Sequence, residues 1–404
     1  MTFHIIEGGV TAAKGFQASG IHCGIRKNRS KADLALIYSD VPCAAAAVYT
    51  QNLVKGAPIA VTKRNIANGM ARAVICNSGN ANTCNADGEE KAQKMCDLIA
   101  AELHIDPSDV IVASTGVIGQ VLPIEPIANS VKTLAEALST TGSNDAAKAI
   151  MTTDTVEKEY ALEVELDGKT VTIGGITKGS GMIHPNMATM LGFLTTDASI
   201  TLLNEALHTA IEDTFNMVSV DGDTSTNDMV SVMASGLAEN QTITEKNHDY
   251  KLFTQALTEV CAVLSRKIAK DGEGATRLLE CAVTGAKTKE DARTVAKSVI
   301  CSNLLKCAIF GADANWGRVL CAIGYSGANV DINGVDVAFE SKQGRIEVCK
   351  NGAGLPFDED IAKKILLEDD IVVAVTLHEG SECATAYGCD LTYDYVKING
   401  DYRT

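Results

Sequence analysis

One stretch in the middle of the chain combines glycines, a turn and a hydroxyl in an order that suits cleavage of its own peptide backbone. From residue 178 it reads KGSGMIHPNMATMLGFLTTDASI. Gly179 and Gly181 permit close approach of the backbone, and the Pro-Asn pair at 185–186 is typical of a turn. The apolar run MLGFL predicts a buried strand, so Thr189 stands where the turn meets the strand, directly after the small Ala188.

A hydroxyl held against the carbonyl carbon that precedes it can attack that carbon. The amide between Ala188 and Thr189 would become an ester, and water would open it to leave a new chain beginning with Thr189. The freed amine has a reference pKa of about 7.7, which suits it to act as base for its own hydroxyl. The alternative is an ordinary threonine at the start of a core strand, where threonine is common.

Several further stretches, together with this one, resemble the ornithine acetyltransferase family, also called the bifunctional glutamate N-acetyltransferases. The string PNMATML is highly specific to the self-processing site of that family, and the likeness runs over essentially the whole chain. The other matching stretches are NSGNANTCNADG (77–88), ASTGVIGQ (113–120), IMTTDT (150–155), SVDGDTSTND (219–228), DGEGATR (271–277), GADANWGRVLCAIGYSG (311–327) and INGDYRT (398–404).

The resemblance implies a glutamate N-acetyltransferase of arginine biosynthesis. The Thr189 hydroxyl would take acetyl from N-acetylornithine, ornithine would leave, and the amine of glutamate would then attack the acetyl-threonine. Such a double displacement replaces one difficult amide exchange with two steps through an ester. A close variant also takes acetyl from acetyl-CoA, and the sequence fits both. No cofactor is expected.

The resemblance also assigns the residues around the nucleophile. Thr115, by its hydroxyl, and Gly116, by its backbone N–H, correspond to the pair that stabilises the tetrahedral oxyanion, although the same residues could form a plain turn at a strand end. Lys178 matches a substrate-binding position, where a cation could hold the α-carboxylate that ornithine and glutamate share. Thr152 matches another substrate contact, and the adjacent Thr153 is its nearest rival.

The second half of the chain supplies three more substrate contacts by resemblance. Glu273 lies between two glycines, where a carboxylate could hold the substrate ammonium or assist proton transfer. Asn399 and Thr404 match the last contacts of the family, which implies that the carboxy terminus folds back over the active site. Thr189 itself is also a substrate-binding position in the family.

Five residues of the matching stretches receive no catalytic assignment. Asn77, Asn80 and Asn82 could support the oxyanion loop, but a structural role in a turn is the favoured interpretation. Trp316 and Arg318 belong to a characteristic stretch, and no chemical role follows from their types.

The elements that must position these residues form a mixed α/β protein. The segment 161–179 alternates apolar and polar residues on both sides of an Asp-Gly pair and predicts a β-hairpin. Strands are also predicted within 334–352 and 370–380. Apolar residues recur every three or four positions and predict helices within 89–105, 126–141, 202–220 and 250–272.

The expected fold class is α/β (α+β), with β-sheets packed against helices. Residues on either side of the cut should interleave in one core, because a newly cut strand stays in place only if both pieces remain packed. The resemblance implies a layered sandwich of the DmpA/ArgJ-like type, cut into an alpha chain of residues 1–188 and a beta chain of residues 189–404. It also implies a heterotetramer of two alpha and two beta chains.

Composition excludes several classes of partner. The chain of 404 residues carries a net charge of −16, so a nucleic-acid backbone is an improbable partner. Its most apolar runs are far shorter than the roughly 20 residues of a membrane helix. Its start, MTFHIIEGGVTAAKG, does not resemble a secretory signal, so a cytoplasmic location is expected.

Thirteen cysteines could suggest disulfides or a metal site, and neither is expected. No C-x-x-C pair occurs, and no histidine lies beside a cysteine at zinc-ligand spacing. The odd number predicts reduced and mostly buried thiols.

Two other functions stay open. A self-processing amidase or aminopeptidase on the same fold would let water, and not glutamate, resolve the acyl-enzyme. A non-catalytic binding relative is disfavoured, because Thr189, Thr115, Gly116, Lys178 and Glu273 are present together.

Overall fold

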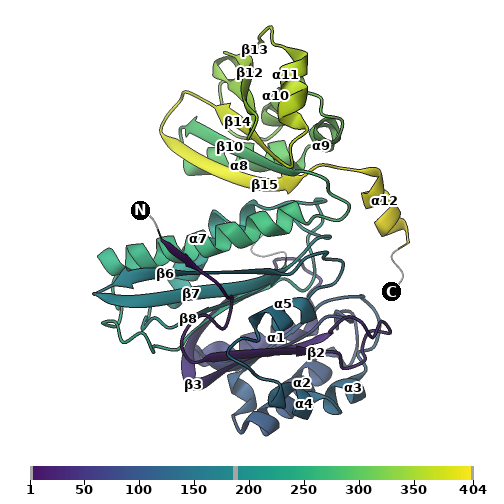
Figure 1. Cartoon of the computed structure of the whole chain (residues 1–404), viewed down its shortest axis with the longest axis vertical. Coiled ribbons are helices and arrows are strands. Elements are labelled where there is room, and N and C mark those ends of the chain that lie inside the picture. Colours follow the sequence, from purple (N-terminus) through teal and green to yellow (C-terminus); the bar gives the residue numbers. More distant parts are fainter. Residues whose placement is uncertain (1–2, 185–189, 402–404) are drawn as a thin grey trace. The chain divides into compact units, whose positions relative to one another are not determined.

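The computed structural model describes residues 3–184 and 190–401, which form two compact units (Figure 1). The first unit comprises Met1–Gly179, Pro185–Phe215 and Thr224–Leu264, and the second comprises Ser180–His184, Asn216–Asp223 and Ser265–Thr404. Both units combine strands and helices, so the predicted mixed α/β class is confirmed. Neither unit is a continuous stretch of sequence, because the chain passes between them several times.

A nine-stranded mixed sheet frames the first unit. Its order is β1-β6-β7-β8-β9-β3-β4-β5, and β2 pairs with β3 outside this path. The strands are β1 (His4–Ile6), β2 (Phe16–Ile21), β3 (Leu34–Tyr49), β4 (Met70–Asn77), β5 (Val110–Ser114), β6 (Lys158–Leu166), β7 (Lys169–Lys178), β8 (Leu191–Thr196) and β9 (Met229–Ala234).

The predicted hairpin is confirmed as β6 and β7, which pair antiparallel from Lys158 opposite Thr177 to Leu166 opposite Lys169. The Asp-Gly pair between them has φ values of 51° and 69°. Two residues with positive φ match the tight turn that joins right-twisted strands, and this requirement explains the Asp-Gly sequence.

Strands from before and after residue 188 lie side by side in this sheet. β8 runs antiparallel to β7 and parallel to β9, and β9 pairs with the last part of β3. Every residue of β8 is buried, so the apolar run MLGFL does lead into a core strand. The expectation of an interleaved core is therefore met in the first unit.

The long strand β3 changes partner along its length. Its first part, Leu34–Tyr38, pairs with both β2 and β4, and its last part, Ala44–Tyr49, pairs with β9. The register with β4 shifts between Tyr38 and Cys43. A bulge of this kind bends a strand and increases its twist, which allows one strand to pair in two parts of the sheet.

Helices cover the sheet of the first unit (Figure 1). α1 and α2 contact β5, α5 contacts β2 and β3, and α6 contacts β3 and β9. The helices are α1 (Ala57–Asn65), α2 (Gly88–Leu103), α3 (Ile124–Ala128), α4 (Val131–Glu136), α5 (Ser143–Ala149), α6 (Leu203–Glu212) and α7 (His248–Lys270), the last of which continues into the second unit.

Two of the four predicted helices are shorter than expected. The segment 126–141 divides into α3 and α4, because Asn129 and Ser130 form a turn between them; both are poor helix formers. The segment 202–220 is α-helical only to Glu212, and a short 3₁₀ helix follows at Phe215–Met217. Beyond it, the Ser219 N–H donates to the Tyr387 carbonyl at 2.9 Å, so the backbone there is bound to a strand.

The second unit has a six-stranded sheet of its own, in the order β13-β12-β11-β14-β10-β15. Its strands are β10 (Leu278–Ala286), β11 (Asp336–Ser341), β12 (Gly344–Lys350), β13 (Ala353–Gly354), β14 (Asp370–Thr376) and β15 (Glu382–Cys389). Its helices are α8 (Lys289–Cys301), α9 (Asn303–Phe310), α10 (Trp316–Gly324), α11 (Glu359–Leu366) and α12 (Tyr393–Gly400).

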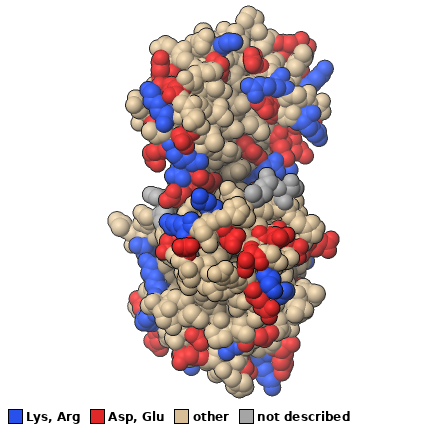
Figure 2. Space-filling model, turned by 90° about the vertical axis from the view of Figure 1, so that its left-hand side faces the viewer, with Lys and Arg blue, Asp and Glu red and all other residues tan. Residues whose placement is uncertain are grey.

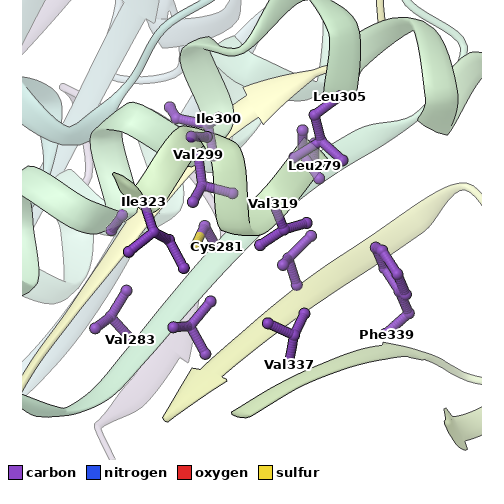
Figure 3. Packing of buried hydrophobic residues seen from close by; sticks show 14 of the residues in the cluster. Leu279, Cys281, Val283, Val299, Ile300, Leu305, Val319, Ile323, Val337 and Phe339 are labelled. Carbon is purple, nitrogen blue, oxygen red and sulfur yellow. The ribbon is translucent and has the colours of Figure 1, made fainter. Parts of the chain in front are cut away.

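The second unit also has a separate hydrophobic core, which the sequence did not predict. Val299 of α8 and Val319 and Ile323 of α10 pack over Cys281 and Val283 of β10, as Figure 3 shows. All five side chains are essentially inaccessible to solvent, and burying one large apolar side chain contributes about 1.5–3 kcal/mol.

Acidic and basic side chains intermingle on the face shown in Figure 2, without a continuous basic field. Among the described residues, no helix combines the length and the apolarity that crossing a membrane requires.

Candidate active site

The predicted nucleophile Thr189, its neighbour Ala188 and the terminal Thr404 lie outside the described residues. The structure does describe the strands on both sides of the predicted cut. β7 ends at Lys178, and β8 begins at Leu191 opposite that lysine. Of the remaining predicted residues, Thr115, Gly116, Thr152 and Lys178 belong to the first unit, and Glu273 and Asn399 belong to the second.

Asp154 is a fully buried aspartate of the first unit that the sequence reasoning missed. One of its oxygens accepts the Gly179 N–H at 2.7 Å, and the other accepts the Thr152 N–H at 2.9 Å. Asp154 therefore joins the end of β7 to the loop that carries Thr152. One carboxylate therefore positions two predicted substrate contacts: Thr152 through its own N–H, and Lys178 through the N–H of the adjacent Gly179.

A buried ion pair completes the bonds of Asp154. The Lys158 ammonium lies 2.7 Å from Asp154 Oδ1, and both side chains are fully shielded from solvent. Burial alone would raise the pKa of Asp154, but the Lys178 and Lys158 ammonium groups and the hydrogen bonds lower it below its ordinary value. Asp154 is therefore a carboxylate at neutral pH.

Lys178 is a buried cation at the end of β7, with 7% of its surface exposed. None of the described residues hydrogen-bonds or ion-pairs with its ammonium. Its charge acts on the Asp154 carboxylate without a direct bond to it, so among the described residues its N–H donors are left for an incoming carboxylate.

The turn that carries Thr115 and Gly116 follows β5 directly. The Thr115 N–H donates to the Asn77 carbonyl at 2.9 Å, so the turn is tied to the end of β4. Gly116 has a φ of 132°, and a Cβ there would lie 2.6 Å from the Gly79 carbonyl carbon. Only glycine suits this position, because both the backbone angle and the space exclude a side chain.

The three asparagines of the 77–82 loop have the structural role that the sequence analysis favoured. Asn77 Nδ2 donates to the Asn80 carbonyl, Asn80 Nδ2 to the Gln120 carbonyl and Asn82 Nδ2 to the Gly88 carbonyl. Asn77 additionally accepts the Ser114 hydroxyl at 2.5 Å, so it also supports the turn of Thr115.

Asp228 is another buried carboxyl of the first unit, and the sequence reasoning missed it. It precedes β9, whose Met229 N–H donates to the Met190 carbonyl at 2.9 Å, immediately beyond the predicted nucleophile. Its Oδ2 has no hydrogen-bond partner within the described part of the chain. Burial raises the pKa of Asp228 well above the ordinary value, so this carboxyl keeps its proton to higher pH than an exposed aspartate.

The group in the second unit centres on Glu273. Its carboxylate accepts the Asn399 side-chain N–H at 2.8 Å, and its backbone N–H donates to the Ser180 carbonyl at 2.8 Å. A Cβ at Gly181 would overlap the Glu273 carboxylate, so the predicted close approach at Gly181 is confirmed. Asn399 lies on α12, so the carboxy-terminal helix contacts Glu273.

Asp221 holds the loop before the predicted cut. Its carboxylate accepts the N–H groups of Met182 at 2.6 Å and Ile183 at 2.9 Å, and the Val220 N–H donates to the Ile183 carbonyl at 2.8 Å. Met182 has a φ of 56°, a left-handed conformation that is uncommon for a residue with a long side chain. The backbone just before residues 185–189 is therefore tightly held.

Trp316 and Arg318 have structural roles in the second unit. Trp316 packs against its hydrophobic core and covers Gly354, and Arg318 donates to the Leu304 carbonyl at 2.5 Å. The thirteen cysteines are free thiols, and seven of them are buried, as predicted.

Only weak sequence signals pointed to Asp154, Asp221 and Asp228. Each lies in a stretch that carries the family resemblance, 150–155 or 219–228, but an aspartate in such a stretch usually belongs to a turn. The burial of Asp154 and Asp228 follows from strands that are distant in sequence.

The chain is similar to known proteins over nearly its whole length. The model of the ArgJ family matches residues 17–404. The arginine biosynthesis bifunctional protein ArgJ 1 of Clostridium acetobutylicum is 51% identical over 398 residues, covering 98% of this chain and 97% of that protein. The corresponding ArgJ protein of Bacillus subtilis is 49% identical over 403 residues, covering 99% and 97%.

A crystal structure of the arginine biosynthesis bifunctional protein ArgJ from Bacillus halodurans is also similar. Its chain is 50% identical, with a TM-score of 0.50, and it covers 53% of this chain and 100% of its own length.

Proposed function

The chain belongs to the ArgJ family, and on that premise we propose that it is an acyltransferase of arginine biosynthesis that moves acetyl from N-acetylornithine to glutamate. The observation in the structure that carries the proposal is Lys178. It offers a buried ammonium that makes no hydrogen bond to any described residue, at the end of the strand that precedes the predicted nucleophile. Both amino-acid substrates present an α-carboxylate that such a cation binds.

We propose that the chain first cuts itself between Ala188 and Thr189. The Thr189 oxygen attacks the Ala188 carbonyl carbon, the C–N bond breaks, and the acyl group passes from nitrogen to oxygen. Water then hydrolyses the ester, which releases the Ala188 carboxylate and a chain that begins with the Thr189 amine. The cut separates an alpha chain, residues 1–188, from a beta chain, residues 189–404.

Two observations support the cut. The backbone before it is held by Asp221, and the strand after it is held between β7 and β9, so the described chain on each side of residues 185–189 is fixed. The solved Bacillus halodurans chain matches along its entire length yet covers only 53% of this chain. Residues 189–404 make up the same share, 216 of 404 residues.

In the transfer reaction, the Thr189 oxygen attacks the acetyl carbonyl carbon of N-acetylornithine. The free Thr189 amine accepts the hydroxyl proton and passes it to the leaving nitrogen of ornithine. The amine of glutamate then attacks the acetyl ester, which forms N-acetylglutamate and restores the hydroxyl. We propose that the Thr115 hydroxyl and the Gly116 N–H donate to the oxyanion formed in each step.

Substrate binding would follow from charge. Lys178 would hold the α-carboxylate, and Thr152 would add a hydroxyl donor to it. In the second unit we propose Glu273, paired with Asn399, for the substrate ammonium, and we carry over Thr404 as a further contact. Thr189 completes the substrate contacts.

We extend the proposal to acetyl-CoA as a second acetyl donor, because the relatives are named bifunctional. We also propose that the two halves stay together after the cut, since β8 and β9 lie between β7 and β3. Assembly into two alpha and two beta chains and a cytoplasmic location stay predictions.

Acetyl transfer is tested by incubating the protein with N-acetylornithine, with and without glutamate. We expect glutamate to accelerate the release of ornithine and to appear as N-acetylglutamate in equal amount. Release of ornithine and acetate at a rate independent of glutamate would instead identify an amidase, and the transferase proposal would fail.

A further inference from the structure

Asn227 is a buried asparagine whose side-chain amide is fully used. It lies just before β9, and 6% of its surface is exposed. Its Nδ2 donates to the Ala81 carbonyl at 2.5 Å and to the Ser114 carbonyl at 3.0 Å. Its Oδ1 accepts the hydroxyls of Thr83 and Thr226, each at 2.6 Å. Two donors and two acceptor sites are all that the amide offers.

The bond to the Ser114 carbonyl reaches the predicted oxyanion turn. That carbonyl belongs to the peptide group between Ser114 and Thr115, whose N–H donates to the Asn77 carbonyl at 2.9 Å. Both polar atoms of this peptide group are therefore held, one by Asn77 and the other by Asn227. The next peptide group along the chain carries the Gly116 N–H. The direction of this N–H therefore depends on the plane of the peptide group between Ser114 and Thr115, which these two hydrogen bonds fix.

The same segment also contacts the strand that continues from the predicted nucleophile. Met229 donates its N–H to the Met190 carbonyl at 2.9 Å and lies opposite Leu191 in the parallel pair of β8 and β9. A short piece of chain, from Asn227 to Met229, thus binds the oxyanion turn at one end and the start of β8 at the other.

The amide of Asn227 has little freedom to turn. A Cβ at Gly56 would lie 2.5 Å from its Nδ2 and 2.7 Å from its Oδ1, so the backbone of Gly56 closes one side. The Ala81 and Ser114 carbonyls can only accept, so they fix which end of the amide is the donor. The donors therefore point to Ala81 and Ser114 in a single arrangement.

We infer that Asn227 is a positioning residue for acyl transfer, which sets the Gly116 N–H at a fixed place relative to β8, the strand that follows the predicted nucleophile in sequence. It acts through the Ser114 carbonyl and has no assigned contact with substrate. The inference rests on the proposed function, because it presumes that Thr115 and Gly116 stabilise the oxyanion.

Asn227→Asp tests the inference, because aspartate keeps the shape and removes both donors. Asn240→Asp is the matched control: Asn240 is also 6% exposed, lies in the same unit and donates to the Ser199 and Gln241 carbonyls at 3.2 and 2.8 Å. The rate of acetyl transfer is measured for each variant and divided by the amount of cut protein. The midpoint of thermal unfolding is measured alongside it.

For Asn227→Asp we expect kcat to fall by about 10- to 100-fold and KM to stay within about twofold of the wild-type value. Removing an oxyanion donor lowers kcat by roughly 10²- to 10³-fold, and misplacing it should cost a part of that factor. Asn240→Asp should lower the thermal midpoint by a similar amount and leave kcat unchanged. Equal kcat for the two variants at equal stability would overturn the inference.

A second variant covers the case in which Asn227→Asp does not fold. Thr83→Val keeps the shape and removes one hydroxyl that fixes the amide, so kcat should fall several-fold with KM unchanged. An unchanged kcat in Thr83→Val would also overturn the inference. If the wild-type protein transfers no acetyl to glutamate, the proposed function fails instead, and the two failures are distinct.

Discussion

Replacing Asp154 by asparagine removes a buried negative charge while keeping the shape of the side chain. Asp154 is the acceptor that joins Lys158, the Thr152 N–H and the Gly179 N–H in the first unit. An amide has one oxygen for these three donors, and its own N–H groups would face at least one of them. The Lys158 ammonium would keep its 3.3 Å contact with the Val156 carbonyl but lose the negative charge of Asp154 beside it.

The expected loss of stability is large because neither side chain of the pair is exposed. Removing one partner from a buried ion pair costs about 3–5 kcal/mol, since it leaves a charge without compensation. The exposed pair of Lys132 and Glu136, 3.9 Å apart and also four residues apart in sequence, provides the matched control. Glu136→Gln should change the free energy of unfolding by less than about 0.5 kcal/mol.

We would measure unfolding in the Thr189→Ala background, which we expect to remain one chain. Hydrogen exchange in peptides from β6 and β7 reports on the first unit. The fluorescence of Trp316, the only tryptophan, reports on the second unit. Asp154→Asn should increase exchange in the first unit more than it shifts the fluorescence transition.

The same substitution should change the dependence of stability on pH. Because the pKa of Asp154 is lower in the folded than in the unfolded chain, its contribution is complete above the unfolded value of about 3.8. That contribution is lost as the pH falls through the lower folded pKa, so Asp154→Asn should flatten the acid side of the curve of stability against pH.

In cut protein, Asp154→Asn should also raise KM, because Thr152 and Lys178 would be held less rigidly. A stability loss below about 1 kcal/mol with an unchanged KM would refute this reasoning.

Three further substitutions test the site directly. Gly116→Ala should lower kcat by about 10²-fold or more, because the new Cβ would lie 2.6 Å from the Gly79 carbonyl carbon; a wild-type kcat in steady-state assays would contradict the oxyanion role. Lys178→Met should lower kcat/KM by about 10- to 100-fold through the loss of a charged hydrogen bond, and unaltered kinetics would remove Lys178 from the site. Asn399→Ala should raise KM only a few-fold, since Asn399 is exposed and Glu273 remains; a large fall in kcat at unchanged KM would show a different role.

The parts of the fold that depend on nearby residues could be predicted from the sequence. The hairpin of β6 and β7 follows from alternation around an Asp-Gly turn, and α7 follows from a long apolar periodicity. The helix predicted through residue 220 stops at Glu212, because the periodicity continues where Ser219 is bound to β15. The pairing of β3 with β9 joins segments too distant for any local pattern to reveal.

The residues of the candidate site could likewise be predicted only in part. Lys178 and Thr152 could be proposed from motifs, and the structure joins them through Asp154. The motifs did not identify Asp154 or Asn227, because each acts through burial and through partners on other strands. An aspartate or asparagine in a polar loop has the same appearance in sequence whether it is solvated or fully bonded in a core.

The central claim is that the chain cuts itself before Thr189 and uses that residue as its nucleophile. Intact-mass measurement of the denatured protein, made in cells and purified in active form, tests it most directly. We predict two masses, those of residues 1–188 and 189–404, for the wild type and one mass for Thr189→Ala. A single uncut mass in an active wild-type preparation would contradict the mechanism.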